Sequence, residues 1–351
     1  MSTRVAVNGL GRTGRSFLRA LHSQDADIEV VAVNDLADPA TVAHLLRYDS
    51  VAGRFPGEVG LDGETLTIDG HPIRALAKSD PGELPWEELE VDVVIESTGR
   101  FRTRAAGARH LDAGARKVII SAPAKGSEPP DATVVLGVNF DAVYDPETHH
   151  IISNASCTTN CLAPVAKVLH EAFGIRHGQM TTVHAYTGDQ MLLDGPHKDL
   201  RRARSAAINI VPTSTGAAKA LGLVIPELDG RLSGYAVRVP TPTGSLIDLT
   251  VEVEKPTSVR GVNDVLARRA DVDGLRGIMQ FTTDPIVSSD IIGSSFSSIV
   301  DGGLTSVVDG TQVKVVAWYD NEYGYSSRLV DLAARVCLSP AVTPALPGAA
   351  R

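Results

Sequence analysis

The first part of the chain alternates short apolar runs with segments whose apolar residues recur every three or four positions. The runs predict strands at 3–8, 28–35, 91–97 and 117–123, and the periodic segments predict helices at 12–23 and 39–49. Strands that are apolar on both faces are typical of a parallel sheet covered by helices on each side. Segment 59–76 interrupts this order, and its Asp-Gly pairs predict a hairpin.

The pattern changes after position 157. Apolar and polar residues alternate strictly along 245–254, which predicts an antiparallel strand with one wet face. Similar segments at 180–186, 232–239 and 312–319 are its expected neighbours. We therefore expect an α/β domain followed by an α+β domain with a mostly antiparallel sheet. The expected limits are 1–156 for the first domain, 157–320 for the second, 321–337 for a C-terminal helix that returns to the first, and 338–351 for a disordered tail.

Composition narrows the class of protein. A length of 351 residues suits two domains. No apolar run is long enough for a membrane span, and the chain starts directly with a strand pattern, without a signal peptide. The three cysteines, Cys157, Cys161 and Cys337, form neither a disulfide framework nor a metal-ligand spacing. These features predict a cytoplasmic protein that binds no membrane and no metal, and the net charge of −9 argues against nucleic-acid binding.

A glycine-rich turn follows the first predicted strand. The sequence 9-GLGRTG-14 matches G-x-G-x-x-G and opens the first predicted helix. Gly9 permits the tight turn, Gly11 lets the backbone approach a pyrophosphate, and Gly14 lets the helix pack closely on the strand. Asp35 ends the next strand, at the distance expected of a carboxylate that holds the ribose hydroxyls. Together these features predict a Rossmann-type dinucleotide-binding domain.

Asp35 also selects the dinucleotide. A carboxylate accepts hydrogen bonds from free 2′- and 3′-hydroxyls and repels a 2′-phosphate. Residues 36–40 contain no Arg, Lys or Ser that could hold such a phosphate. We therefore expect the cofactor to be NAD rather than NADP.

A cysteine lies at a predicted helix start in 153-SNASCTTN-160. Ser156 is the expected N-cap of a helix that continues through 161–173, which would put Cys157 at the positive end of the helix dipole. That position favours the thiolate and predicts a pKa below the free-thiol value of about 8.5. The alternative is a small buried core residue, as most cysteines are. His184, on a predicted buried strand, is the candidate base, although a core role also suits a histidine there.

These motifs resemble the phosphorylating glyceraldehyde-3-phosphate dehydrogenases of the NAD-dependent, bacterial type. The resemblance runs nearly end to end, through NGLGRTGR, SNASCTTN, TTVHAYTGDQ, STGAAKA, RVPTPT and WYDNEYGYS. It implies that Cys157 is the nucleophile and His184 the residue that activates it. The implied reaction converts D-glyceraldehyde 3-phosphate to 1,3-bisphosphoglycerate with NAD and inorganic phosphate, through a hemithioacetal and a thioester on Cys157. The resemblance also implies a homotetramer whose core uses the loop at about 188–210.

The resemblance assigns two groups of binding residues. One group would bind the cofactor: Gly9, Gly11, Arg12, Thr13, Asp35, Ser97, Thr98, Ser121 and Asn321. In the other group, Ser156, Thr158, Thr215 and Gly216 would bind inorganic phosphate, Thr187 and Arg238 the phosphate of the substrate, and Arg202 a further anion. Pure helix capping is the alternative role for Ser156 and Thr158. A solvated basic face is the alternative for 201-RRAR-204.

Several residues depart from the family pattern. Leu10 and Thr13 stand where the family usually has Phe and Ile, and Ser79 stands where many members have an arginine near the adenine, with Lys78 beside it as a substitute. These residues suggest a further hypothesis, an isozyme that tolerates cysteine-directed inhibitors.

Two other functions compete with the phosphorylating reaction. In erythrose-4-phosphate dehydrogenase, water instead of phosphate attacks the thioester, and the intact 214-STGAAKA-220 motif argues against that enzyme. A catalytically idle binding protein on the same scaffold is disfavoured by the complete set of catalytic and anion-binding residues and by the acidic net charge.

Overall fold

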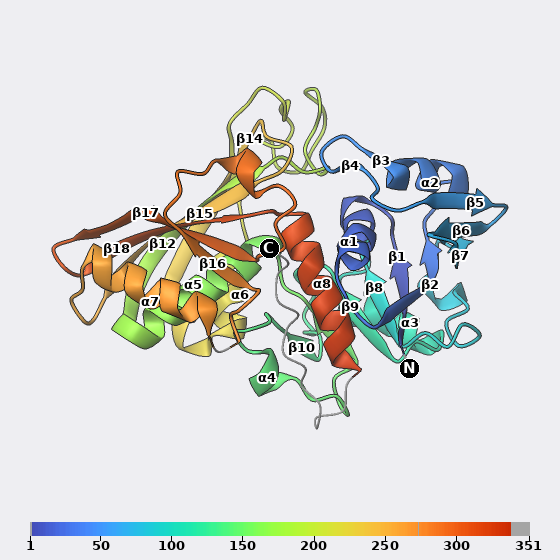
Figure 1. Cartoon of the computed structure of the whole chain (residues 1–351), viewed down its shortest axis with the longest axis horizontal. Coiled ribbons are helices and arrows are strands. Elements are labelled where there is room, and N and C mark those ends of the chain that lie inside the picture. The colour runs from blue at the N-terminus through green and yellow to red at the C-terminus, as the bar shows by residue number, and fades with distance from the viewer. Residues whose placement is uncertain (1, 273, 338–351) are drawn as a thin grey trace. The chain divides into compact units, whose positions relative to one another are not determined.

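The computed structural model describes residues 2–272 and 274–337, which fall into two compact units (Figure 1). The first unit comprises 2–134, 140–155 and 326–337, and the second comprises 135–139 and 156–325. The tail 338–351, for which we predict disorder, lies outside the described residues. Within them, every helix is too short or too polar to span a membrane.

The first unit is built on a sheet whose central strands are parallel, as the apolar runs predict. The order of its strands is β10 (Ala132–Thr133), β11 (Ile151–Ser153), β9 (Lys117–Ile120), β8 (Val93–Glu96), β1 (Thr3–Asn8), β2 (Ile28–Asn34), β7 (His71–Leu76), β6 (Thr65–Ile68) and β5 (Val59–Asp62). Neighbours from β10 to β7 pair in parallel. Val5, Ala6 and Val7 of β1 have no exposed surface, because this strand is covered on both faces.

The predicted hairpin forms the antiparallel edge of this sheet. β5 pairs with β6 and β6 with β7, so the segment contributes three strands. Asp69 and Gly70 join the last two with φ of +50° and +81°, the conformation for which an Asp-Gly pair is suited.

The helices of the first unit are α1 (Arg12–Ser23), α2 (Pro39–Arg47), α3 (Arg104–Asp112), α4 (Phe140–Val143) and most of α8 (Tyr323–Val336). The prediction of a helix over 39–49 is two residues too long, since Tyr48–Asp49 form β3 and pair with β4 (Gly53–Arg54).

α8 is anchored to the first unit along its length. The Ser326 hydroxyl donates to the Thr13 carbonyl at 3.4 Å, and the Tyr144 hydroxyl donates to the Val336 carbonyl at 2.6 Å. Leu329 and Val330, between these contacts, are fully buried.

The second unit has a mostly antiparallel sheet, which confirms the fold class expected for it. Its strands lie in the order β13 (Val211–Ser214), β14 (Leu232–Val239), β12 (Ile175–Ala185), β15 (Ser245–Val253), β18 (Gln312–Tyr319), β17 (Ser298–Val308) and β16 (Met279–Thr282). The pairs β12–β14 and β16–β17 are parallel. For the first of these pairs the reason is the crossover through β13 and α6 (Ala217–Val224), which returns the chain in the same direction.

Two helices, α5 (Cys157–Phe173) and α7 (Val259–Asp271), pack against β17 of this sheet (Figure 1). α5 begins where Ser156 was expected to cap it, because the Ser156 hydroxyl accepts the Thr159 N–H at 3.0 Å. A long irregular loop, 186–210, joins β12 to β13 and rises from the unit in Figure 1. The fold thus places a helix N-terminus, the end of a buried strand and a long loop in one unit.

Candidate functional site

A cavity of about 240 Å³ lies at the carboxyl ends of β1 and β2 in the first unit. Five residues predicted to bind the cofactor line this cavity: Gly9, Gly11, Asp35, Ser97 and Thr98. They come from three separate segments of the sequence, and the parallel sheet brings them together. This end of a parallel sheet is where ligands of such folds bind.

A glycine suits each of the three positions of the turn for a different structural reason. Gly9 has a φ of +96°, and a Cβ on it would lie 2.7 Å from the Thr98 nitrogen. A Cβ on Gly14 would lie 2.1 Å from the Gly9 carbonyl oxygen, so the helix approaches the turn as closely as predicted. A Cβ on Gly11 would meet nothing within 4 Å. Because packing does not demand a glycine there, the open space before the α1 N-terminus fits the close approach of a pyrophosphate.

The Asp35 carboxylate is held in place by the backbone around the cavity. It accepts the Leu10 N–H at 2.7 Å and the Ala37 N–H at 2.9 Å. Lys78 and Arg100 line the same cavity, so its wall carries both signs of charge. The donor and acceptor set fits a ribose at Asp35.

We expect Asp35→Gly to weaken NAD binding about 10- to 100-fold, because the ribose loses hydrogen bonds to a charged acceptor. The preference for NAD over NADP should narrow as well, since Lys78 and Arg100 stay on the wall and attract the extra phosphate. Titration of NAD and NADP by fluorescence measures both changes. Asp25→Gly, at an exposed loop position, is the matched control and should change neither affinity. An Asp35→Gly variant with unaltered affinities would contradict the assignment.

Four other predicted cofactor residues lie outside the lining of this cavity. Arg12 donates from Nη1 to Asp49 at 2.5 Å, Thr13 is in the first turn of α1, and Ser121 follows β9. Asn321 belongs to the second unit, where its Oδ1 accepts the Ser245 hydroxyl at 2.8 Å.

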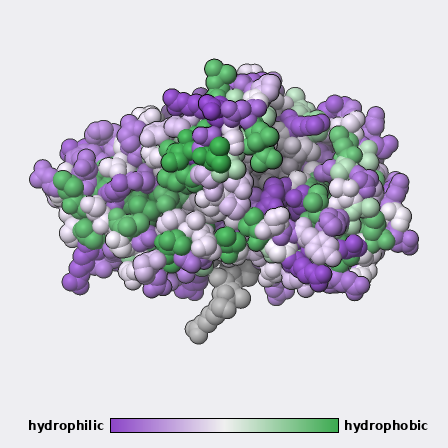
Figure 2. Space-filling view, turned by 90° about the horizontal axis from the view of Figure 1, so that it is seen from above, coloured by the Kyte–Doolittle hydropathy of each residue, from purple (hydrophilic) through white to green (hydrophobic). Residues whose placement is uncertain are grey.

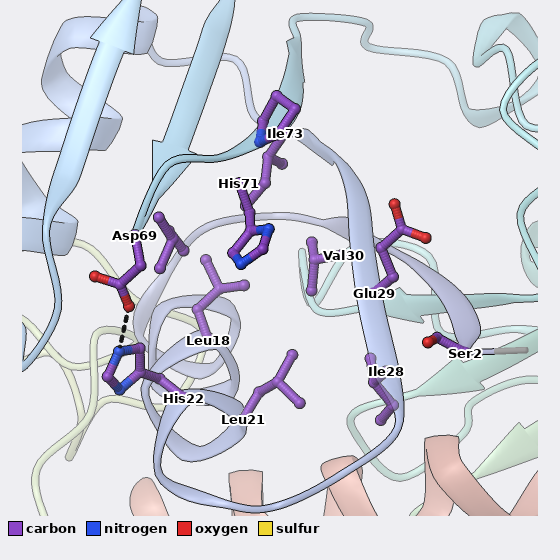
Figure 3. Close-up of a pocket in the computed structure, with 12 residues that line it drawn as sticks. Ser2, Leu18, Leu21, His22, Ile28, Glu29, Val30, Asp69, His71 and Ile73 are labelled. Atoms are coloured by element: carbon purple, nitrogen blue, oxygen red, sulfur yellow. Dashed lines mark hydrogen bonds and ion pairs between the residues drawn. The ribbon is translucent and has the colours of Figure 1, made fainter.

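A larger cavity, of about 450 Å³, lies beside α1 and contains none of the predicted site residues (Figure 3). Its wall is mainly aliphatic, and Figure 3 shows Leu18, Leu21 and Val30 around the His71 ring. His22 and Asp69 pair across its rim at 2.7 Å. Size alone therefore does not mark the reactive site in this chain.

The second unit brings Cys157 and His184 together. Cys157 is the first residue of α5, and its Sγ lies 3.5 Å from Nε2 of His184, near the end of β12. Cys157 is partly exposed, whereas His184 has 4% of its surface exposed. The His184 and Tyr319 rings pack in a T-shaped arrangement, with ring centroids 5.9 Å apart. A nucleophile and a base at this distance form the arrangement needed for covalent catalysis.

The ionisation of this pair differs from the sequence-based expectation. Burial raises the pKa of the Cys157 thiol above its ordinary value, while the nearby Arg238 guanidinium and the amides of the first turn act in the opposite direction. Burial, followed by the Arg238 charge, lowers the pKa of His184 to about 3. The prediction of a lowered Cys157 pKa is therefore wrong for the chain without substrate, because the helix dipole is outweighed by the loss of water around the sulfur. Both shifts favour the uncharged forms of the pair in the chain without substrate.

Arg238 lies beside His184 on the neighbouring strand, in register with it. Its Nη1 is 2.9 Å from Nδ1 of His184, and it donates to the Ala185 carbonyl at 2.9 Å and to the Thr187 hydroxyl at 3.2 Å. Its Nε is buried and has no hydrogen-bond partner among the described residues. The predicted anion residues Arg238 and Thr187 are thus brought to the Cys157–His184 pair.

The other predicted anion residues have different surroundings. Thr215 accepts the Ala217 N–H at 3.2 Å and, with Gly216, forms the start of α6, which has no side-chain cap. Arg202 donates to the Thr213 hydroxyl at 2.9 Å and pairs with Asp189. The Thr158 hydroxyl is buried against the Tyr319 hydroxyl at 2.9 Å, so this side chain points into the core.

Two residues of this site are missing from the sequence-based predictions. Asp189 accepts hydrogen bonds from Arg202 and from the Thr187 hydroxyl. The buried Tyr319 hydroxyl connects Thr158 to Thr182, at 2.9 and 2.8 Å. Their sequence signals were an acid four residues after the end of the His184 strand and a tyrosine that ends an apolar strand, and neither signal alone indicates a function.

Comparison with known proteins gives matches over both units. Residues 3–104 match the family model described as "Glyceraldehyde 3-phosphate dehydrogenase, NAD binding domain", and residues 156–321 match "Glyceraldehyde 3-phosphate dehydrogenase, C-terminal domain". The chain is 60% identical over 343 residues to a glyceraldehyde-3-phosphate dehydrogenase of Mycobacterium avium, covering 96% of this chain and 99% of the relative. It is 58% identical over 336 residues to that of Geobacillus stearothermophilus, covering 96% and 98%.

Proposed function

Because the chain belongs to the glyceraldehyde-3-phosphate dehydrogenase family, we propose that it oxidises D-glyceraldehyde 3-phosphate with NAD and inorganic phosphate, giving 1,3-bisphosphoglycerate. The observation that carries this proposal is the Cys157 sulfur at the start of α5, 3.5 Å from His184 Nε2. Arg238, whose buried Nε has no partner among the described residues, supplies a place for an anion beside that pair.

The proposed chemistry starts at the Cys157 sulfur. Sulfur forms a bond to the aldehyde carbon, the carbonyl electron pair moves to oxygen, and the thiol proton is transferred to that oxygen, which gives a hemithioacetal. The Cys157 backbone N–H and the His184 imidazole hold its oxygen. His184 then takes the hydroxyl proton at Nε2 as the hydride leaves the carbon. NAD, when bound, is the hydride acceptor.

The second half of the reaction needs a second anion. The hemithioacetal has become a thioester, and an oxygen of inorganic phosphate attacks its carbon. The carbon–sulfur bond breaks, the acyl phosphate leaves, and the Cys157 sulfur regains a proton from the protonated His184. We assign the substrate's own phosphate to Arg238 and Thr187. Inorganic phosphate is assigned to Ser156 at the start of α5 and to Thr215 and Gly216 at the start of α6, where the N-cap Gly216 has no side chain to occupy the remaining N–H groups of the first turn.

Arg202 and Thr158 have lesser roles in this proposal. Arg202 already donates to Thr213 and Asp189, so it steadies the anion region through those residues. The Thr158 hydroxyl stays with Tyr319, which leaves the Thr158 backbone as the group available to phosphate.

A steady-state assay with two aldehydes tests the function. D-glyceraldehyde 3-phosphate should reduce NAD rapidly only when inorganic phosphate is present. Erythrose 4-phosphate should be the poorer substrate, because the phosphate site at the start of α6 favours phosphorolysis over hydrolysis. Faster oxidation of erythrose 4-phosphate, unaffected by phosphate, would replace this proposal with erythrose-4-phosphate dehydrogenase.

Thr215→Ala should slow the phosphate-dependent step and leave the first turnover intact. The lost hydroxyl lies at the α6 start rather than next to the sulfur, so NADH should still form in a normal burst. Steady-state turnover should then fall about 5- to 10-fold, as expected for one hydrogen bond to a charged group. Stopped-flow absorbance separates the two phases, and equal losses in both would remove Thr215 from the inorganic-phosphate site.

The loop 186–210 supports a homotetramer. Five of its apolar side chains are largely exposed: Leu192, Leu193, Leu200, Ile208 and Ile210, with exposures of 76%, 76%, 81%, 80% and 69%. Apolar atoms gather on the face seen from above in Figure 2, the side from which this loop rises. Such surfaces mark protein contacts, and a second copy of the chain is the partner we propose. Analytical ultracentrifugation should give four times the chain mass of 37.0 kDa.

We also propose that the enzyme acts in the cytoplasm, because the mechanism needs Cys157 as a free thiol and that compartment keeps thiols reduced. Tolerance of cysteine-directed inhibitors is a separate proposal that rests on Leu10 and Thr13. The rate of inactivation by iodoacetamide, compared with that of the Geobacillus stearothermophilus relative, tests it.

A further inference from the structure

We propose that an oxyanion bound by Arg238 switches His184 into the state that accepts a proton, so that the substrate's phosphate activates the base as well as anchoring the substrate. This inference rests on the proposed function, because it assigns a regulatory role to a residue of the same site. It makes Arg238 a positioning residue for His184 and a determinant of specificity for phosphorylated aldehydes.

Two groups compete for one ring nitrogen of His184. Nδ1 lies 2.7 Å from the Ala185 carbonyl oxygen and 2.9 Å from Nη1 of Arg238. The carbonyl can only accept a hydrogen bond, and the guanidinium can only donate one. A neutral Nδ1 carries either a proton or a lone pair, so it satisfies one neighbour and opposes the other.

The two outcomes have opposite consequences for Cys157. With the proton on Nδ1, His184 donates to Ala185 and turns the lone pair of Nε2 toward the sulfur at 3.5 Å. With the lone pair on Nδ1, His184 accepts from Arg238, and Nε2 carries the proton. Only the first state can take a proton at Nε2. Arg238, as placed without substrate, favours the second.

Arg238 has a reason to turn toward an anion. No carboxylate among the residues that the structure describes lies at ion-pair distance from it, and its buried Nε lacks a partner. The nearest acid, Asp189, already accepts from Arg202 and from Thr187. Asp189 favours the Arg238 charge without pairing with it, and an oxyanion matches a guanidinium with paired hydrogen bonds.

The charged groups around His184 act on the pKa of its ring in opposite directions. Arg238 and Arg202 disfavour the imidazolium and Asp189 favours it, while loss of water raises the pKa of the Cys157 thiol and of the Tyr319 hydroxyl. Burial and then Arg238 are the main causes that lower the pKa of His184. An anion that neutralises Arg238 therefore raises this pKa and makes the ring a stronger base.

The consequence is a form of substrate selection. The phosphate of a phosphorylated aldehyde binds Arg238 and so activates His184. When unphosphorylated glyceraldehyde reaches Cys157, Arg238 still donates a hydrogen bond to His184. The aldehyde and the activating anion can then be supplied separately in an experiment.

The test measures the pre-steady-state NADH burst with saturating D-glyceraldehyde and NAD, with and without phosphite. The burst precedes attack on the thioester, so it reports the step in which His184 accepts the proton. In the wild-type chain we expect phosphite to accelerate the burst about 3- to 10-fold, because a base of higher pKa accepts the proton faster. The acid limb of the pH–rate profile, where the burst slows because His184 becomes protonated, should move to higher pH.

Arg238→Gln removes the charge and keeps a hydrogen-bond donor. Its burst with glyceraldehyde should no longer respond to phosphite, and its acid limb without phosphite should already lie at higher pH than that of the wild type. A role in anchoring alone would abolish the response to phosphite and leave the limb where it is. Arg201→Gln, at an exposed position of the basic cluster, is the control and should keep the full response.

The outcomes are separable from those for the function itself. An unchanged wild-type burst with phosphite, or equal acid limbs in the wild type and Arg238→Gln, overturns the coupling while rapid oxidation of D-glyceraldehyde 3-phosphate leaves the function standing. If D-glyceraldehyde 3-phosphate itself gives no NADH, the proposed function fails.

Discussion

Replacing Cys157 with serine should lower dehydrogenase turnover on the order of 10⁴-fold or more, because the residue forms both covalent intermediates. A serine hydroxyl titrates far above a thiol, and the neutral His184 is too weak a base to ionise it. NAD binding should survive, since the lining of the cofactor cavity comes from Gly9, Asp35 and their neighbours in the first unit. Turnover and NAD titration on the same preparation measure the two effects.

Cys161→Ser is the matched control, one helical turn further along α5. Cys161 is fully buried, and its sulfur lies 3.6 Å from the Ser298 hydroxyl and 3.8 Å from the Ala317 carbonyl oxygen. A serine there finds the same partners, so turnover should stay within about twofold of wild type. Near-normal turnover in Cys157→Ser would end the proposed mechanism.

His184→Asn should slow the NADH burst by about 10²- to 10⁴-fold, the range for loss of a general base. Alkylation of Cys157 by iodoacetamide should change much less, because the resting imidazole is neutral and the α5 amides and Arg238 remain as the groups that favour the thiolate. Stopped-flow bursts and alkylation rates across pH, measured on the same variant, give the comparison.

His177→Asn provides the control on the same strand, at an exposed position of β12. It should alter neither the burst nor the alkylation rate. If His184→Asn lost burst and alkylation to the same extent, the histidine would act by ionising the sulfur instead of by accepting the substrate's proton.

Much of the fold is predictable because local pattern and burial agree. The fully buried β1 reads as an apolar run, and β15 alternates as a strand with one wet face should. α3 is missing from the predictions because its sequence RAAGARHLD has a single large apolar residue, Leu111, so no apolar stripe reveals it. The parallel pairing of β14 with β12 also depends on a crossover that neither strand encodes.

The features of the site also divide into those set by the local sequence and those set by distant segments. The cap at Ser156 and the turn at Gly9 follow from local rules, and the structure has both. The ionisation of Cys157 does not follow from its place on a helix, because burial by distant strands sets the sign of the shift. The inward direction of the Thr158 hydroxyl depends on Tyr319, which lies 161 residues away in the chain.

The return of α8 to the first unit has a consequence for biosynthesis. The Thr13 carbonyl accepts a hydrogen bond from Ser326, which follows 313 residues later in the chain. The second unit supplies most of the sequence between these two residues. A nascent chain leaving the ribosome therefore holds an incomplete dinucleotide-binding unit until translation is nearly finished. The surface that Leu329 and Val330 cover in the folded protein stays exposed during that time. A chaperone would need to shield this surface of the nascent chain.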